Sequence, residues 1–300
     1  MNVLITGGTT FVSKYAAEYF INRGDRVSVL NRGSRAQVEG VEHIRADRLN
    51  LSGALEGRSF DTVLDITAYT AGDIRALLLS GVSFKDYVFI SSSAVYPDTA
   101  PQPFTEETPC GENSVWGSYG INKLEAERYL TENEPGAYIL RPPYFYGKYD
   151  NLYRETFVFD CAMKDRPFYI PGEGNMRLQF FSVADLCRFI EILLTKRPSD
   201  RVFNVGNPGT VTVREWVELC YRAAGRKVEL RSVDKLVPQR EYFPFYDYEY
   251  VLDVSKQAEL MPETTPVEKG LTEEFKWYKL HPESVYRRRP YIDFIDKNLR

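Results

Sequence analysis

Cysteine is scarce in this sequence, which has four cysteines in 300 residues. Cys110, Cys161, Cys187 and Cys220 lie far apart and form no Cys-x-x-Cys pair. This spacing argues against a metal centre and favours reduced thiols in a reducing cytosol. Long apolar runs are absent as well, because no stretch approaches the roughly 20 residues needed to cross a bilayer. Since the chain also starts without a basic leader or a small-residue cleavage site, we expect a cytoplasmic protein outside the membrane.

A large excess of charge of one sign is missing too. The net charge is −4 and the isoelectric point is about 5.5, so nucleic acid is disfavoured as the main partner. Hydrophobic residues make up 43% and charged residues 27%, as in globular proteins. The sequence has no internal repeat and no low-complexity linker. The sequence does not determine the oligomeric state, and a homodimer is one alternative.

Short β-rich runs alternate with helical patterns through the first half, which predicts an α/β fold with a doubly wound parallel sheet. The expected strands are 2–6, 26–30, 42–45, 62–66, 87–91 and 137–141. The expected helices are 12–22, 71–79, 119–132, 153–164, 184–194 and 213–224. We assign residues 1–150, with a return segment at about 178–206, to a dinucleotide-binding domain. Residues 151–177 and 207–300 then form a smaller, interleaved substrate domain.

A glycine turn follows the first expected strand. It lets the backbone approach a pyrophosphate, and the helix that begins near Thr10 offers unpaired N–H groups to its charge. The Gly-x-x-Gly-x-x-Gly pattern is incomplete, because Thr10 and Ser13 stand where its second and third glycines would be. Both side chains are small and are common helix caps. The residues expected to contact a dinucleotide here are Gly7, Gly8, Thr10, Phe11 and Val12; the alternative is an ordinary strand–turn–helix.

Tyr119 and Lys123 form a Tyr-x-x-x-Lys pair on an expected helix, where positions i and i+4 share one face. A nearby ammonium and a nicotinamide cation would favour the phenolate of Tyr119 and make it a usable proton shuttle. The same spacing recurs at Tyr144 and Lys148, within a segment flanked by proline and glycine. Tyr119 is the better candidate because a serine cluster ends a strand upstream of it.

Several segments in this order resemble the extended short-chain dehydrogenase/reductases, the NAD-dependent epimerase/dehydratase superfamily. They are Val3–Ser13, His43–Arg48, Asp65–Tyr69, Phe89–Tyr96, Tyr119 with Lys123, Leu140–Gly147, Val183–Leu186 and Phe203–Gly206. The resemblance covers nearly the whole chain and implies a Rossmann-type fold that binds NAD(P) and a small-molecule substrate. Within the superfamily the chain is closer to a divergent branch that resembles the chloroplast stem-loop-binding proteins.

The resemblance also implies roles for single residues. The catalytic hydroxyl falls on Ser92, with Ser93 beside it as a substrate contact. Dehydratases of this family carry Asp-Glu at the next two positions and decarboxylases carry a Glu, where this chain has Ser93-Ala94. Dehydration and decarboxylation are therefore disfavoured. What remains is epimerisation, carbonyl reduction or alcohol oxidation of a sugar-like substrate, with a nucleotide sugar among the candidates.

The end of the second expected strand bears on the choice of cofactor. NAD-specific members have an acidic residue there, whereas this chain has Asn31, followed by Arg32 and Arg35. These arginines would suit a 2′-phosphate, so NADP is favoured over NAD. Asp47 matches the acid that contacts adenine. The other residues expected at the cofactor are Arg48, Thr67, Ala68 and Pro142.

The substrate end departs from the family pattern. Tyr144 replaces an asparagine common in the family, and the arginine that often binds a sugar-nucleotide diphosphate falls on Leu178, with Arg177 adjacent. We retain Tyr144 and Arg177 as substrate candidates. The aromatic run 242–250 is interpreted as a buried strand and lid packing. Two alternatives stay open: a cofactor-bound RNA-binding protein, and a dinucleotide-sensing scaffold with weak catalysis.

Overall fold

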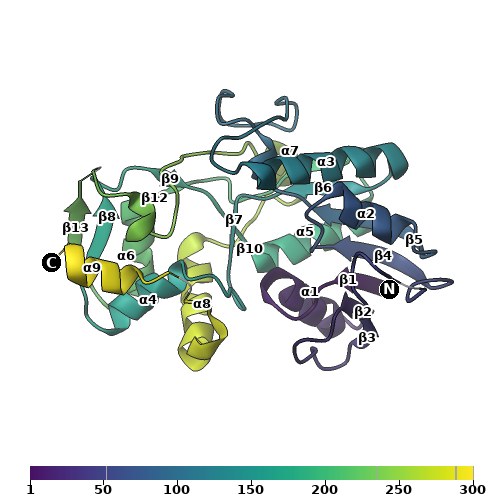
Figure 1. Cartoon of the computed structure of the whole chain (residues 1–300), viewed down its shortest axis with the longest axis horizontal. Coiled ribbons are helices and arrows are strands. Elements are labelled where there is room, and N and C mark those ends of the chain that lie inside the picture. The colour runs from purple at the N-terminus through teal and green to yellow at the C-terminus, as the bar shows by residue number, and fades with distance from the viewer. Residues whose placement is uncertain (52, 235, 288, 300) are drawn as a thin grey trace.

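A seven-stranded parallel sheet forms the centre of the larger lobe (Figure 1). The computed structural model describes residues 1–51, 53–234, 236–287 and 289–299. The strand order is β11-β6-β5-β4-β1-β2-β3, and every neighbouring pair runs parallel. The strands are β1 (Asn2–Thr6), β2 (Arg26–Asn31), β3 (Glu42–Arg45), β4 (Ser59–Asp65), β5 (Ser83–Ile90), β6 (Tyr138–Arg141) and β11 (Val202–Asn204). The predicted doubly wound sheet is confirmed.

Helices cover both faces of this sheet. In β1, Val3 and Ile5 point to the face covered by α1 (Phe11–Asn22) and α5 (Val183–Lys196). Leu4, between them, points to the opposite face, which α2 (Ala71–Leu78) and α3 (Ser118–Asn133) cover. This alternation follows from the two-residue period of a strand, so a fully buried parallel strand reads as a continuous apolar run. Within the described ranges, no helix has the length and apolar character needed to cross a membrane.

The second lobe is built around an aromatic core that includes Phe157, Trp216 and Tyr278. Its helices are α4 (Glu155–Met163), α6 (Val213–Ala223), α8 (Val267–Leu280) and α9 (Tyr291–Asn298), with β8 (Phe168–Pro171) paired to β13 (Leu230–Val233). The strand expected within 242–250 is wrong: an irregular segment follows the short helix η2 (Gln239–Glu241). Phe243 and Phe245 are instead buried against Trp216 of α6, with ring centroids at 6.0 and 5.1 Å from it.

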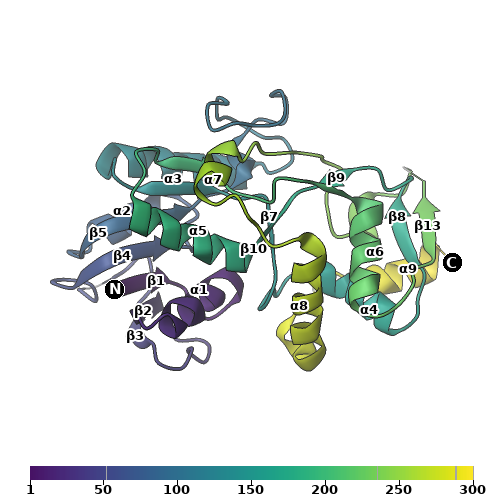
Figure 2. The ribbon, with the colours of Figure 1, turned by 180° about the vertical axis from the view of Figure 1, so that it is seen from behind.

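The chain passes between the lobes several times. β7 (Tyr144–Tyr146) pairs with β10 (Phe180–Ser182) at the junction, and β9 (Arg177–Leu178) pairs with β12 (Val211–Thr212). Between the second-lobe segments that end at residue 250 and those that begin with α8, the chain returns to the sheet, where α7 (Ser255–Leu260) lies beside β11 (Figure 2). Both polar atoms of the Gln257 amide bond the backbone of Gly206, at 2.8 and 3.1 Å. The predicted domain division remains a prediction, and α7 is a part of 207–300 that contacts the sheet lobe.

Three carboxylates are buried together near this junction. Asp150, Glu155 and Glu274 have oxygens within 4.8 Å of one another, and Arg154 pairs with Asp150 at 2.9 Å. Among the described residues, neither oxygen of Glu155 has a hydrogen-bond donor. Burial therefore raises the pKa of Glu155 to about 7, and the nearby Asp150 adds to this effect.

Candidate active site

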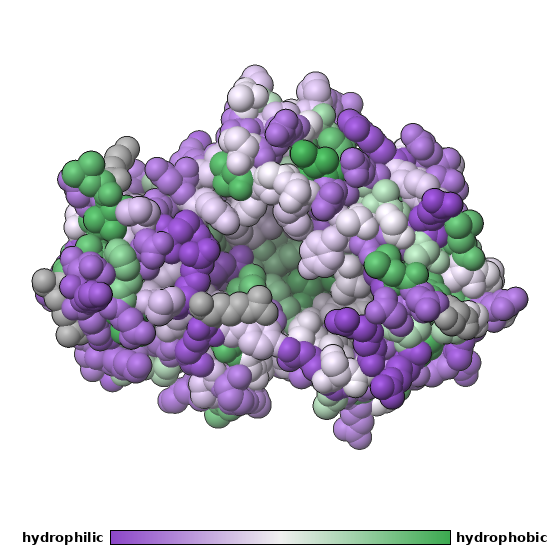
Figure 3. Space-filling model, in the orientation of Figure 1, coloured by the Kyte–Doolittle hydropathy of each residue, from purple (hydrophilic) through white to green (hydrophobic). Residues whose placement is uncertain are grey.

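A cavity of about 390 Å³ opens at the carboxyl ends of the strands. Its walls come from the first turn of α1, the segments after β4, β5 and β6, the start of α3, and the loop before α4. The lining residues are Thr10, Phe11, Val12, Ser13, Ile66, Thr67, Tyr69, Ile90, Ser91, Ser92, Tyr119, Lys123, Pro142, Pro143, Phe145, Asn151 and Leu152. Figure 3 shows a hollow with an apolar floor between the two lobes. This edge of an open parallel sheet is where such folds bind ligands.

The glycine turn is held closely against the sheet. Gly7 and Gly8 have φ of +96° and +86°, and a Cβ at Gly8 would lie 2.5 Å from Val29 Cγ1. Thr10 occupies the N-cap position of α1, but its side chain makes no capping hydrogen bond, so the capping expected of it is wrong. The Ser13 hydroxyl donates to the Thr10 carbonyl at 2.9 Å. The amides of the first turn of α1 therefore remain available to a ligand in the cavity.

Tyr119 and Lys123 reach the cavity because α3 packs closely on the segment after β5. Gly120 makes this contact possible, since a Cβ there would lie 2.3 Å from the Ala94 carbonyl oxygen. On the facing side, Ser92 begins the short helix η1 (Ser93–Val95), and its hydroxyl accepts from the Ala94 amide at 3.1 Å. Tyr119, Lys123 and Ser92 thus line one cavity together with Thr10, Phe11 and Val12.

Burial shifts the pKa values of both Lys123 and Tyr119. The Lys123 ammonium donates to the carbonyls of Ala68 and Ile90, at 2.7 and 2.8 Å, and burial lowers its pKa to about 8. Burial raises the pKa of Tyr119, and a hydrogen bond with Ser92 opposes the shift. The stabilisation of the phenolate expected from Lys123 and a nicotinamide cation remains a prediction. Tyr119 is a neutral phenol at pH 7, ready to donate a proton.

The residues expected near the adenosine end lie outside this cavity. The Asn31 amide donates to the Gly7 carbonyl at 2.6 Å and accepts from the Gly33 amide at 2.8 Å. Arg32 and Arg35 are exposed on the loop that follows, and the Arg35 guanidinium lies 5.2 Å from the Tyr286 ring centroid.

Asp47 and Arg48, on the segment after β3, are not in the cavity either. Asp47 is exposed and accepts from the Leu49 amide at 3.0 Å. The Arg48 guanidinium pairs with the buried Asp65 and lowers its pKa, so this arginine is already neutralised.

The predicted substrate residues are spread over the junction. Ser93 is buried, and its amide donates to the Pro142 carbonyl at 3.0 Å. The Tyr144 ring packs 4.7 Å from Phe245. Arg177 is bound by Glu249, with Nη2 to Oε1 at 2.6 Å. Among these, none lines the cavity.

Sequence reasoning missed several lining residues. The Tyr69 ring lies 6.2 Å from that of Tyr119 and 5.0 Å from the Lys123 ammonium. Tyr69 follows Thr67 and Ala68 at a strand end, and this position could have indicated from the sequence that it lines the cavity. Asn151 and Leu152 come from the loop after β7, where the sequence shows no motif.

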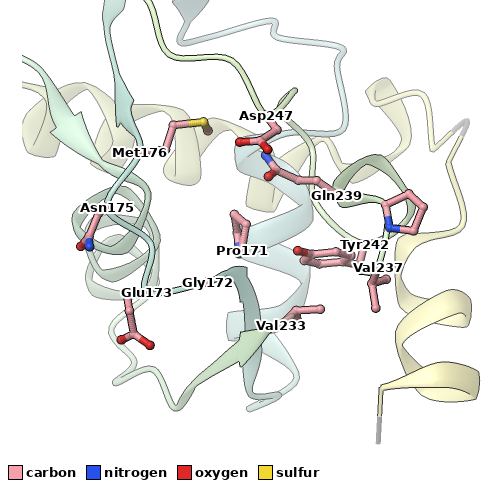
Figure 4. A pocket seen from close by; sticks show the side chains of 11 residues that line it. Pro171, Gly172, Glu173, Asn175, Met176, Val233, Val237, Gln239, Tyr242 and Asp247 are labelled. Atoms are coloured by element: carbon pink, nitrogen blue, oxygen red, sulfur yellow. The ribbon is translucent and has the colours of Figure 1, made fainter. Parts of the chain in front are cut away.

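A separate cavity of about 590 Å³ lies within the second lobe (Figure 4). Tyr242, Gln239 and Asp247 line one part of it, opposite Pro171 and Gly172. Its charged lining residues are Glu173 and Asp247, both acidic, so it is unsuited to an anion.

Comparison with known proteins identifies the family. Residues 3–206, the strands and crossovers that build the sheet and its cavity, match the NAD dependent epimerase/dehydratase family. The chain belongs to this family. An Arabidopsis thaliana relative, the chloroplast stem-loop binding protein of 41 kDa b, is 25% identical over 91% of this chain and 78% of its own length.

Two further relatives of this family member are sugar-nucleotide enzymes by name. UDP-glucuronic acid decarboxylase 1 of Arabidopsis thaliana is 25% identical over 73% of this chain and 57% of its own length. The dTDP-glucose 4,6-dehydratase of Streptomyces niveus is 26% identical over 64% and 57%. The chain thus spans less than two thirds of these two proteins.

Solved structures share the fold of this family member. The dTDP-glucose 4,6-dehydratase of Bacillus anthracis, in complex with NAD, has a TM-score of 0.76 at 20% identity and covers 95% of this chain and 98% of its own. The UDP-glucose 4-epimerase of Thermotoga maritima, with UDP-glucose, has a TM-score of 0.73 at 19% identity over 93% and 99%.

Proposed function

We propose that this protein is an NAD(P)-dependent epimerase or oxidoreductase that acts on a hydroxyl or carbonyl carbon of a sugar-like substrate. The observation that carries the proposal is the convergence of Tyr119, Ser92 and Lys123 on the cavity that the first turn of α1 lines. The family's dependence on NAD supports the same conclusion.

The residues present fit a dinucleotide. Gly7 and Gly8 adopt positive φ angles in the turn before α1. The first turn of α1 lines the cavity, and its backbone amides would bind a pyrophosphate there. The Lys123 ammonium would reach the nicotinamide ribose. A nicotinamide bound here would supply the exchange of hydride with the substrate carbon.

Tyr119 and Ser92 would manage the proton. In carbonyl reduction, the neutral Tyr119 phenol donates its proton to the carbonyl oxygen while the Ser92 hydroxyl hydrogen-bonds that oxygen. In alcohol oxidation the Tyr119 phenolate, whose negative charge Lys123 would balance, accepts the hydroxyl proton and becomes the neutral phenol. The cavity lining contains no carboxylate among the described residues, which favours these reactions over water elimination.

NADP remains our preferred cofactor within this proposal. Arg32 and Arg35 are exposed on the loop after β2, where a 2′-phosphate of the adenosine ribose would lie. An RNA-binding role is the second candidate, favoured by the name of the Arabidopsis relative. The net charge of −4 weighs against it.

Titration calorimetry with NAD(H) and NADP(H) tests the proposal. We expect micromolar or tighter binding of at least one dinucleotide. If neither binds at millimolar concentration, the enzyme assignment fails. Tight binding of single-stranded RNA by a protein that ignores both dinucleotides would support the second candidate instead.

A further inference from the structure

A cavity of about 340 Å³ adjoins the candidate active site. Asn151 and Leu152 line both cavities, so the two are neighbours on either side of this loop segment. The other lining residues are Tyr153, Arg154, Arg240, Pro244, Tyr286, Arg289 and Tyr291. These side chains come from the segment before α4, the segment around η2, and the chain just before and within the start of α9. All belong to the second lobe.

Two of its three arginines carry charge that the described residues do not neutralise. Arg154 pairs with Asp150 at 2.9 Å. Arg240 instead donates to the carbonyls of Phe243 and Pro244, and its buried Nε has no hydrogen-bond partner among the described residues.

Arg289 is close to Arg240. Its Nη1 donates to the Arg240 carbonyl at 3.4 Å. In the described part of the chain, neither guanidinium has a carboxylate within ion-pair distance, unlike Arg166, Arg177 and Arg222 on the same lobe. Two uncompensated guanidinium groups beside an open cavity favour an anion, because partly desolvated charges interact strongly.

We propose that this arginine cavity binds an anionic group of the substrate, a phosphate or a carboxylate, while the reacting carbon lies at Tyr119. The inference rests on the proposed function and adds the charge of the substrate to it. The cavity of Figure 4 does not compete for this group, because its charged lining residues are acidic. The Tyr153 and Tyr291 rings, stacked at 6.0 Å, would pack against the carbon atoms next to the anion.

Calorimetric titration at low salt tests this assignment. The probes are inorganic phosphate, glucose 6-phosphate, glucuronate and the neutral control glucose, each with and without saturating NAD(H). We expect both sugar anions to bind at least tenfold more tightly than glucose. Which of the two binds better distinguishes a phosphate from a carboxylate subsite.

The variants are Arg240→Gln, Arg289→Gln and the double variant, each checked for folding by circular dichroism. Each single change should lower the affinity for the sugar anions by tenfold or more and leave the affinity for glucose unchanged. Arg222→Gln is the matched control, because Arg222 is exposed and already paired with Glu268 at 2.8 Å. If Arg240→Gln fails to fold, the exposed Arg289 still provides the test.

Equal binding of sugar anions and glucose, or anion binding that survives in Arg289→Gln and in the double variant, would overturn the assignment. So would a loss of NADP(H) affinity in these variants without any change in the sugar anions, since the cavity would then serve the cofactor phosphate. The proposed function fails separately, if no dinucleotide binds while the sugar anions still do.

Discussion

Two tyrosines of this chain are followed by a lysine four positions later, and their surroundings differ. Tyr119 lines the cavity and hydrogen-bonds Ser92, whereas Tyr144 packs among the rings of Phe245, Tyr250 and Trp116. A proton shuttle needs to reach the reacting oxygen. Replacing each tyrosine by phenylalanine should therefore have different effects on the rate of the reaction.

Tyr119→Phe removes the hydroxyl and almost no volume, so folding and dinucleotide binding should persist. Turnover should fall by about 10²–10⁴-fold, as for the loss of a general acid or base. Steady-state kinetics with any substrate found by screening measures this. Tyr144→Phe is the matched control and should leave kcat nearly unchanged, because Tyr144 does not line the cavity. The opposite pattern would reverse the two roles.

Arg32→Asp tests the preference for NADP. A guanidinium that pairs with a 2′-phosphate contributes about 1.5–3 kcal/mol, so the affinity for NADP(H) should fall tenfold or more. The affinity for NAD(H) should stay equal or improve. Calorimetry measures both. A wild-type protein that prefers NAD, with no change in the variant, would refute the preference.

At the residue scale, the sequence allowed prediction of the lining residues that follow strand ends, such as Thr67 and Ser92. Strand ends are recognisable because apolar runs stop there. Asn151 and Leu152 were not predictable, since an irregular loop brings them to the cavity and their backbone has no periodic pattern.

At the scale of elements, the contact of α3 with the segment after β5 determines whether the site forms. Gly120→Ala should destabilise the protein by about 1–3 kcal/mol, because the added methyl meets the Ala94 carbonyl. The activity of the folded variant should also fall, since Tyr119 and Lys123 move with the helix. Thermal unfolding and kinetics measure the two effects. Gly209→Ala is the control, having no atom within 4 Å of the added Cβ, and an equal response of both variants would contradict the argument.

The buried carboxylates that join α4 to α8 should make stability depend on pH. Glu155 has an ordinary pKa near 4.5 and a folded value of about 7, so the folded protein binds more protons between these values. The free energy of unfolding should therefore fall by about 1–3 kcal/mol as pH rises from 5 to 8. The groups facing Glu155 are Asp150, Arg154, Glu274, Tyr146 and Cys220.

Urea unfolding across this pH range measures the effect. Glu155→Gln should reduce the slope, because an amide stays neutral throughout, while Glu274, whose pKa burial also raises, maintains the remainder. The exposed Glu259→Gln should keep the slope of the wild type. If the free energy of unfolding instead rises between pH 5 and 8, the carboxylates of the cluster are ionised in the folded protein.

The sheet strands and their helices were predictable because local apolar patterns determine them. The segment Tyr144–Tyr146, which is flanked by proline and glycine, is not among the strands expected from the sequence, yet it forms β7. Its partner β10 lies more than thirty residues later, and three residues carry too short a pattern to reveal such a pairing.

At the scale of the whole molecule, α7 is a late segment that packs on the sheet lobe before the chain enters α8 of the second lobe. Gln257→Leu leaves the amide and carbonyl of Gly206 buried without partners, so the protein should lose on the order of 2–5 kcal/mol. Calorimetry should still show one transition, shifted to lower temperature. Lys256→Ala, on the exposed face of the same helix, should shift it little. Two separate transitions would mean that the lobes unfold independently.

The return of α7 could not be predicted from the sequence, because six residues give no reliable amphipathic signal. Its position depends on contacts such as the burial of Met261 in the core that α1 and α5 form.

This return has a consequence for protein fragments. A polypeptide ending at Gly206 would retain every residue by which the family is recognised, but Gln257 and Met261 would be gone. The backbone of Gly206 would then lack these hydrogen bonds, and the apolar surface that Met261 covers would be exposed to other molecules, which promotes aggregation. We therefore expect the stretch that identifies the family not to fold as an autonomous unit. Its folding should depend on residues beyond the matched range, such as Gln257 and Met261.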